Sequence, residues 1–227
     1  MVKLQVINAA EIERFQNWTC LIYSEPGKGK TTMVRELTGR TVVFSVDRMY
    51  QVLSGIPNIQ ILVMDSKKPI DELGTFYKYL KSNLDNIDNI VIDNLSTFQK
   101  FWLNSVAKET KSGMPEIKDY GVIDRVLLDF VASLKDLNKN LLLFAHEKKV
   151  EIVRETGGVY TQHQPDIRNM DAVMGIVPLV GRLVIHDDER IIVLQPTQST
   201  RAKDQLIGNI KTIGQMELLP LLQKGEN

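Results

Sequence analysis

Short apolar runs alternate with segments of helical periodicity over the first two thirds of the chain. The runs that are short enough for buried strands lie at 18–23, 41–46, 59–64, 90–93 and 141–144. Between them, apolar side chains recur at helical spacing over 73–87, 98–106 and 122–137. Strands that alternate with helices predict a mostly parallel sheet flanked by helices. The expected fold class is therefore α/β.

The pattern changes after residue 146. Gly157 and Gly158 separate two runs of strand-like residues, 149–156 and 159–164, which predicts an antiparallel hairpin. A second hairpin is predicted where residues 187–189 separate 182–186 from 190–194. Neither a repeat nor a low-complexity linker interrupts the sequence. We therefore expect a single domain over residues 1–205, with C-terminal antiparallel hairpins, and a C-terminal tail over 206–227.

Composition limits the partners and the compartment. Lys plus Arg and Asp plus Glu both number 28 among 227 residues, so the net charge is zero and any nucleic-acid binding must come from a local patch. The single cysteine, Cys20, lies in the first apolar run and is expected in a reducing compartment. The sequence shows no apolar run of about 20 residues and no signal-peptide core. We expect a cytoplasmic protein without a membrane partner.

The strongest chemical signal lies between the first strand and the first helix. Its residues are Ser24, Glu25, Pro26, Gly27, Lys28, Gly29, Lys30, Thr31 and Thr32. The two glycines let backbone N–H groups turn toward phosphate oxygens, and a helix that starts near Lys30 adds its positive dipole end. Lys30 can reach the β and γ phosphates, and the Thr31 hydroxyl can bind Mg²⁺. The loop predicts a nucleoside triphosphate site, although Ser24 replaces the first glycine of the usual pattern.

Asp93 ends an apolar strand and is the expected second Mg²⁺ ligand, a Walker B aspartate. Asn94 follows it where many hydrolytic P-loop proteins carry a water-activating glutamate. The base must then come from elsewhere, or hydrolysis is slow. Asp47, at the end of the strand after the P-loop helix, is our choice because that strand should lie beside the Asp93 strand. Glu25 and Glu147 are alternatives, and Asp47 as a plain strand-end cap is another.

Two further features complete the candidate site. His146 ends the strand at 141–145, and between the P-loop and Walker B strands it would sense the γ-phosphate; a surface histidine is the alternative. His163 and His186 fall on the predicted hairpins and are expected at the surface, outside any metal site. Arg201 and Lys203 would point the same way on an extended segment, as fingers on a neighbouring subunit's γ-phosphate or as a solvated basic surface.

Four segments together resemble the P-loop nucleotide-binding proteins of phages of Gram-positive bacteria, compact relatives of the RecA fold and of phage single-strand annealing ATPases. These segments are LIYSEPGKGKTT, IVIDN, LLLFAHEKK with the hairpin after it, and RAKDQ. The resemblance covers roughly residues 15–205. It implies a RecA-like core that binds ATP and ADP with Mg²⁺ through Lys30, Thr31 and Asp93.

The resemblance also implies a homo-oligomer with nucleotide at the subunit interface, where Arg201 and Lys203 act. Single-stranded DNA would be held by the segments 108–118 and 147–168, and phage or host replication proteins would be partners in the host cytoplasm. The two segments contain lysines and arginines for DNA, with Tyr120 and Tyr160 available for base stacking, but also five glutamates, so their charge is only mildly positive.

The sequence leaves three functions open. The first is an ATPase in phage DNA recombination or replication, as the site pattern indicates. The second is a nucleotide-dependent adaptor or helicase loader, which the neutral charge and Asn94 favour. The third is a small-molecule kinase, which usually needs an arginine-rich lid that the segments after Asp93 lack. ATP is favoured over GTP because the guanine-reading [NT]-K-x-D pattern is missing.

Overall fold

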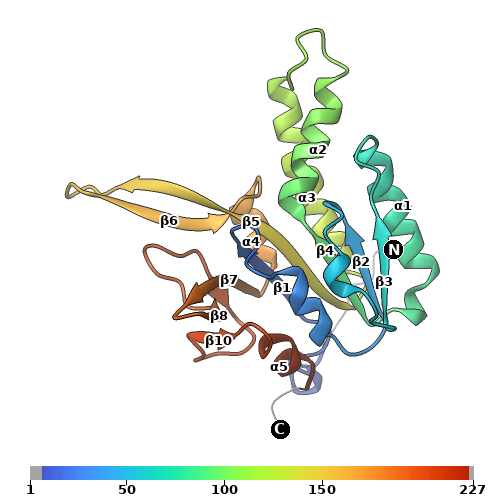
Figure 1. The fold of residues 1–227 in the computed structure, drawn as a ribbon, viewed down its shortest axis with the longest axis vertical. Helices are drawn as coiled ribbons and strands as arrows, with labels where there is room; N and C mark the ends of the chain where they lie inside the picture. Colours follow the sequence, from blue (N-terminus) through green and yellow to red (C-terminus); the bar gives the residue numbers. More distant parts are fainter. Residues whose placement is uncertain (1–6, 225–227) are drawn as a thin grey trace.

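A computed structural model describes residues 7–224, and over these residues ten strands form one twisted sheet (Figure 1). The strands are β1 (Thr19–Ser24), β2 (Thr41–Ser45), β3 (Ile59–Val63), β4 (Asn89–Asp93), β5 (Asn140–Val153), β6 (Val159–Pro165), β7 (Leu179–His186), β8 (Glu189–Val193), β9 (Lys203–Asp204) and β10 (Thr212–Gly214). The α-helices are α1 (Pro69–Ser82), α2 (Leu95–Ala107), α3 (Ile117–Lys135), α4 (Met170–Ile176) and α5 (Leu218–Lys224). Four short 3-10 helices are η1 (Ala9–Glu11), η2 (Thr31–Glu36), η3 (Gln51–Leu53) and η4 (Leu84–Asn86) in the same part of the chain.

The strand order is β10-β8-β7-β1-β5-β4-β2-β3, and β3, β2, β4, β5, β1 and β7 run parallel to their neighbours. This arrangement confirms the predicted α/β class. The expectation that the last third is only an antiparallel addition is wrong for β7. That strand pairs parallel with β1 and antiparallel with β8, so it extends the parallel sheet before the chain turns back.

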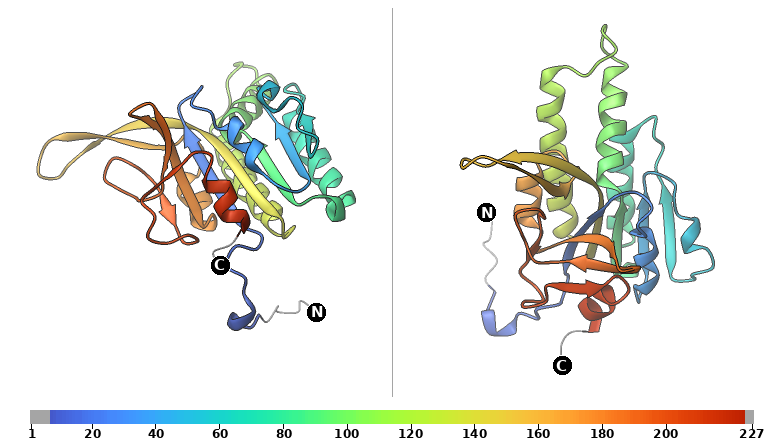
Figure 2. Two further views of the ribbon diagram at one scale, coloured as in Figure 1. Left: turned by 60° about the horizontal axis from the view of Figure 1, so that its bottom comes forward. Right: turned by 60° about the vertical axis from the view of Figure 1, so that its left-hand side comes forward.

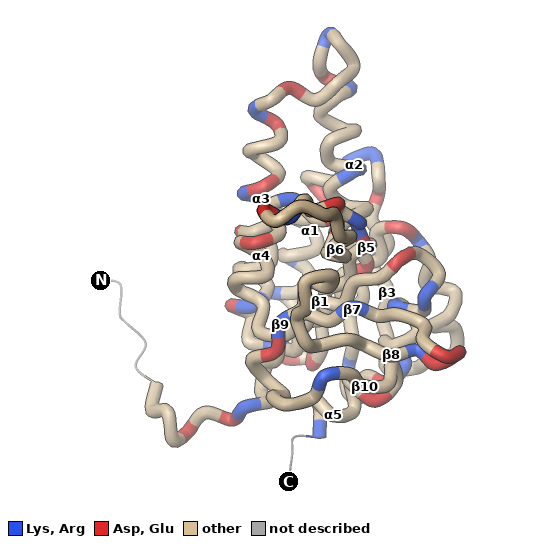
Figure 3. Tube along the Cα trace, turned by 90° about the vertical axis from the view of Figure 1, so that its left-hand side faces the viewer, with Lys and Arg blue, Asp and Glu red and all other residues tan. Residues whose placement is uncertain are grey.

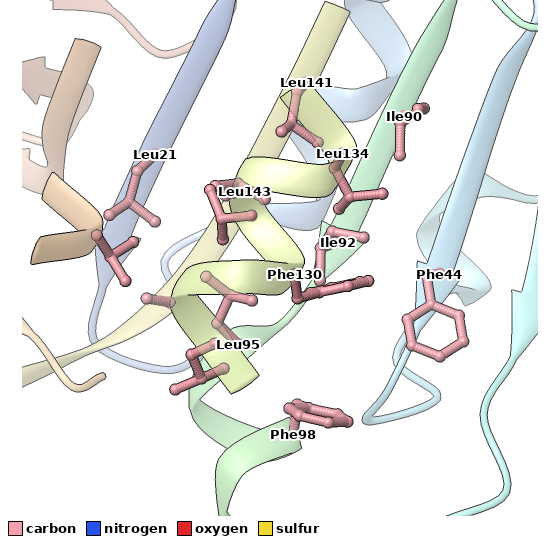
Figure 4. Close-up of a cluster of buried hydrophobic side chains, with 14 of the residues drawn as sticks. Leu21, Phe44, Ile90, Ile92, Leu95, Phe98, Phe130, Leu134, Leu141 and Leu143 are labelled. Carbon is pink, nitrogen blue, oxygen red and sulfur yellow. The ribbon is translucent and has the colours of Figure 1, made fainter. Parts of the chain in front are cut away.

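The sheet has an apolar core on each face because alternate strand residues point to opposite sides. Leu21 and Tyr23 of β1 pack toward α1, α2 and α3, whereas Cys20 and Ile22 pack toward η2 and α5. In Figure 4, Phe130 and Leu134 of α3 lie over strand side chains of the first core. The two buried layers hold the carboxyl ends of β1, β4 and β5 beside one another.

Two hairpins project from this body in different directions (Figures 1 and 2). Helices α2 and α3 form a helical hairpin whose turn lies beyond the sheet. β5 is a single strand of 14 residues; its first half lies in the sheet and its second half pairs antiparallel with β6. The hairpins predicted at 149–164 and 182–194 are confirmed by these pairings and by β7–β8.

The segment beyond residue 205 contributes to the fold. β10 pairs with β8, and Leu218, Leu219 and Leu222 of α5 are fully buried against the η2 face. The sequence pattern showed neither these elements nor α4 and β9. None of the described helices combines the length and the apolar character needed to cross a bilayer.

Candidate nucleotide-binding site

The loop between β1 and η2 is held by its own lysine. The Lys30 amine donates to the Ser24 hydroxyl (2.9 Å), to the Ser24 carbonyl (3.2 Å) and to the Glu25 carbonyl (3.4 Å). The Ser24 hydroxyl in turn donates to the Glu25 carbonyl at 2.8 Å. Serine at this position therefore supplies an oxygen that glycine would lack. Burial of Lys30, which is 7% exposed, lowers the pKa of its amine.

The glycines have the conformations that the loop requires. Gly27 and Gly29 have φ of 77° and 98°, where residues with a Cβ are strained. The helix expected after the loop is the 3-10 helix η2, six residues long, and its Met33 and Val34 are buried. It ends at Glu36 because Leu37 is already extended and leads toward β2.

The expected Mg²⁺ ligands lie in direct contact. The Thr31 hydroxyl donates to a carboxylate oxygen of Asp93 at 2.6 Å. Asp93 is 3% exposed, and burial raises the pKa of its carboxyl to about 6, against the lowering effect of the Thr31 hydrogen bond. Nearby Asp47 also raises this pKa, and Lys30 lowers it. A hydroxyl and a buried carboxylate beside a lysine fit Mg²⁺ bound with phosphate, because the cation would offset the cost of ionising Asp93.

Asn94 connects two further polar residues of the site, Asp47 and His146. Its side-chain oxygen accepts the Thr97 N–H (2.8 Å), which fixes the orientation of the amide. The amide nitrogen then donates to Asp47 (2.9 Å) and lies 3.3 Å from Nε2 of His146. Nε2 also lies 3.4 Å from the Thr97 hydroxyl, whereas Nδ1 is buried without a hydrogen-bond partner among the described residues. Asn94 thus occupies the place after Asp93 as an organiser of its neighbours.

The strand order meets the condition on which the sensor role of His146 depends. β5 pairs with β1 on one side and with β4 on the other, and His146 lies opposite Ser24 at the end of β1. The expectation that His146 ends its strand is wrong, because β5 continues to Val153 in its pairing with β6. Burial and the charge of Lys30 lower the pKa of its imidazole, followed by the charge of Lys100. The side chain is consequently neutral at pH 7.

These residues border one cavity of about 340 Å³, a size within the usual range for ligand pockets. Its lining includes Pro26, Gly27, Gly29, Lys30, Thr31, Thr32, Asp47, Asp93, Asn94 and His146. Met49, Gln51 and Val52 also line it, and no sequence signal pointed to them. The cavity is thus lined by a lysine, a hydroxyl, a carboxylate and glycine backbone, a set that fits a Mg²⁺-bound polyphosphate.

The model of a family of AAA domains matches residues 16–206, which is most of the chain. The chain belongs to this AAA domain family. No curated protein matches the chain. The match and the site agree on a nucleotide-binding P-loop ATPase of α/β fold.

Of the three carboxylates considered as the base in this AAA domain, Asp47 lines the cavity whereas Glu25 and Glu147 do not. Glu25 pairs with Lys149 (2.7 Å) and Lys28 (3.7 Å), and the Lys149 hydrogen bond lowers the pKa of its carboxyl. The role of Asp47 stays a prediction.

Glu147 is part of a buried polar cluster that sequence reasoning missed. Its carboxylate, 1% exposed, accepts two hydrogen bonds from Arg182 (2.8 and 3.1 Å) and lies 2.6 Å from Nδ1 of His163. His163, expected at the surface, has a side chain that is only 19% exposed, because it lies near the end of β6, where the backbone bonds to Ser199 and Arg201. His186 is 70% exposed, as expected. The cluster joins the hairpin β5–β6 to β7.

Arg201 and Lys203 of the AAA domain lie beside α4 and do not line the cavity. Arg201 pairs with Asp171, and the Lys203 amine donates to the carbonyls of Met174 (2.9 Å) and Gly175 (3.0 Å). The Tyr23 hydroxyl, from β1, donates to the carbonyl of Arg201 at 2.8 Å. The two cations face the same helix, and their role across a subunit interface stays a prediction.

Proposed function

We propose that this AAA domain is a RecA-like, Mg²⁺-dependent ATPase that acts on DNA in recombination or replication, in cells infected by a phage. The observation that carries the proposal is the course of β5. One strand begins in the core, places His146 at the nucleotide cavity and continues as the projecting hairpin with β6. A residue that responds to phosphate and a surface that contacts another molecule thus lie on the same strand.

Each residue of the cavity would have its own role in the reaction. The glycine loop and Lys30 would hold the phosphates, and bound Mg²⁺, held by Thr31 and Asp93, would neutralise charge on them. Asp47 would accept a proton from the attacking water, with its carboxylate oriented by the Asn94 amide. His146, neutral at pH 7, would hydrogen-bond to the γ-phosphate and lose that partner after hydrolysis.

The hairpin offers a surface that can stack nucleic-acid bases. Arg154 lies over the ring of Tyr160, with 5.3 Å between the guanidinium carbon and the ring centroid. Aromatic and arginine side chains of this kind bind single strands with little regard to sequence. Figure 3 shows acidic and basic residues interspersed along this hairpin, which favours stacking over simple charge attraction.

The proposed ATPase is tested by ATP turnover with and without single-stranded DNA, using Lys30→Ala as the inactive control. We expect DNA to stimulate turnover, and ATP to increase DNA retention at low salt. Tyr160→Ala should weaken DNA binding about 5- to 150-fold, the value of one stacked base. The control is Lys81→Ala, which removes the cation of another cation–aromatic pair, with Tyr77 on α1. Absence of both stimulation and retention would exclude the DNA function.

A nucleotide-dependent adaptor, such as a helicase loader, is the second candidate. The zero net charge and the mixed charges of both projecting hairpins support it, because neither feature attracts DNA over long range. A stoichiometric replication protein recovered from infected-cell extract with ATP, together with no DNA affinity of the purified chain, would favour the adaptor.

The ATPase would assemble with nucleotide between subunits, and Arg201 and Lys203 would reach a neighbour's phosphate. Their present partners, Asp171 and the end of α4, would have to be exchanged for that phosphate. Mixing Lys30→Ala subunits with Arg201→Ala subunits tests this, because partial recovery of turnover requires sites shared between subunits. Full activity of Arg201→Ala alone would exclude it.

A further inference from the structure

The P-loop is covered on one side by residues from the last quarter of the chain. Gln215, between β10 and α5, donates its side-chain amide to the carbonyl of Gly29 at 2.6 Å. Its backbone N–H donates to the carbonyl of Arg190 at 2.9 Å, and the residue is 6% exposed. A buried glutamine therefore connects the phosphate-binding loop to the start of β8.

Strand register explains why Arg190 reaches the loop. Tyr23, near the end of β1, lies opposite Arg182 of β7, and Arg190 lies opposite Ile185, three residues farther along β7. The hairpin β7–β8 thus extends past the end of β1. Arg190 shares a sheet face with Ile192, which packs in the core beside η2. A Cβ placed on Gly29 would lie 3.5 Å from Nε of Arg190 and 2.8 Å from the amide nitrogen of Gln215.

Charge pairing distinguishes Arg190 from the other cations around the loop. Lys28 and Lys149 both pair with Glu25, and Lys30 is bonded to loop oxygens. Within residues 7–224, no carboxylate oxygen lies within 4.0 Å of the Arg190 guanidinium, and its side chain is exposed. An arginine beside a phosphate loop, without an acidic partner, is available to bind phosphate.

The side of the loop on which Arg190 lies indicates which phosphates of the nucleotide it would contact. Thr31, Asp93 and His146 mark the Mg²⁺ and γ-phosphate side, on the flank formed by β5 and β4. Arg190 comes from the opposite flank of β1, formed by β7 and β8. We propose that Arg190 binds the diphosphate portion that ATP and ADP share, and that Gln215 positions Arg190 against the loop. The inference rests on nucleotide binding at the P-loop, as proposed above.

The test is titration of fluorescent ATP and ADP into the wild type, Arg190→Ala, Arg190→Lys and Arg125→Ala. Arg125 is an exposed arginine on α3 and serves as the matched control. We expect Arg190→Ala to weaken both nucleotides about 10-fold, Arg190→Lys to weaken them less, and Arg125→Ala to leave both unchanged. Turnover should show a higher KM at unchanged kcat, because the contact is the same in the ground and transition states.

Equal affinities of wild type and Arg190→Ala would overturn the inference and leave the proposed function intact. Loss of ATP affinity alone would overturn the assignment to the diphosphate portion. A wild type that binds no nucleotide would overturn both proposals. For Gln215 the readout is the double variant: since Gln215 acts through Arg190, adding Gln215→Ala to Arg190→Ala should raise the KM no further. An additional increase would exclude the positioning role.

Discussion

The free-energy cost of ionising the buried Asp93 predicts whether Asp93→Asn is more or less stable than the wild type. Asp93→Asn keeps the shape of the side chain and an oxygen that can accept the Thr31 hydroxyl, but removes the charge. Burial raises the pKa of the wild-type carboxyl from 3.8 to about 6 in the folded state. At about 1.36 kcal/mol for each pH unit, the ionised carboxylate costs the folded state about 3 kcal/mol above pH 6. Asparagine removes this cost, but burying its amide N–H group costs the folded state about 1 kcal/mol.

We therefore expect Asp93→Asn to be more stable than the wild type by about 2 kcal/mol at pH 7.5. The sign follows from proton binding: between pH 3.8 and about 6 the folded carboxyl keeps a proton that the unfolded chain releases, so wild-type stability falls as pH rises through this window. Above the window the difference between the two proteins stays constant.

The assay is urea unfolding of both proteins at several pH values from 5 to 7.5, without nucleotide or Mg²⁺. Asp88→Asn is the control with the opposite sign, because hydrogen bonds from Arg40 lower the pKa of Asp88 and its charge favours the folded state at neutral pH. The reasoning is refuted if Asp93→Asn is no more stable than the wild type at pH 7.5, or if the difference is the same at pH 5. In the presence of Mg²⁺ and ATP the order should reverse, because only the wild type binds the metal tightly.

Four other substitutions test three residues of the site and the buried cluster around Glu147. Lys30→Ala should abolish ATP binding with an unchanged circular dichroism spectrum, and wild-type affinity would contradict the site. Asp47→Asn should lower kcat about 100-fold at similar KM, and unchanged kcat would return the role of base to another group. His146→Ala should keep ATP affinity within about twofold while turnover no longer responds to DNA; a retained response would exclude the sensor role. Glu147→Ala leaves the Arg182 charge unpaired and should lower the free energy of unfolding by about 3 kcal/mol in urea titrations, whereas a loss below about 1 kcal/mol would show that water replaces the carboxylate.

The sequence predicted the parts of the fold that depend on local pattern. Apolar runs located the core strands, and Gly157-Gly158 located a hairpin, because these signals lie within a few residues of the elements they specify. The position of β5 between β1 and β4 was only a condition for the role of His146, because strand order depends on pairings between distant segments; the structure has this order. Thr31 and Asp93, both predicted as Mg²⁺ ligands from local motifs, lie in hydrogen-bond contact.

The rest depends on pairings between distant segments. Arg182 meets Glu147 across 35 residues, and Gln215 meets Gly29 across 186, and no local pattern encodes either distance. His163 was expected at the surface because a histidine on a hairpin usually faces water, but its hairpin starts inside the body of the protein. The parallel pairing of β7 was missed because a strand in a hairpin can pair with the main sheet through its other edge.

The continuity of β5 has a mechanical consequence. Residues 147–153 extend about 23 Å beyond the level of His146, at about 3.3 Å for each residue. A tilt of about 5° at the base of this arm would therefore move its tip by about 2 Å. Within the sheet, β5 is fixed by hydrogen bonds to β1 and β4, whereas beyond His146 it pairs with β6. Angular shifts at the base of the arm that are too small to disturb the core are thus magnified at Val153. Distances between labels on Val153 and on α3 should therefore report events at the nucleotide site more sensitively than distances between any two positions within the sheet.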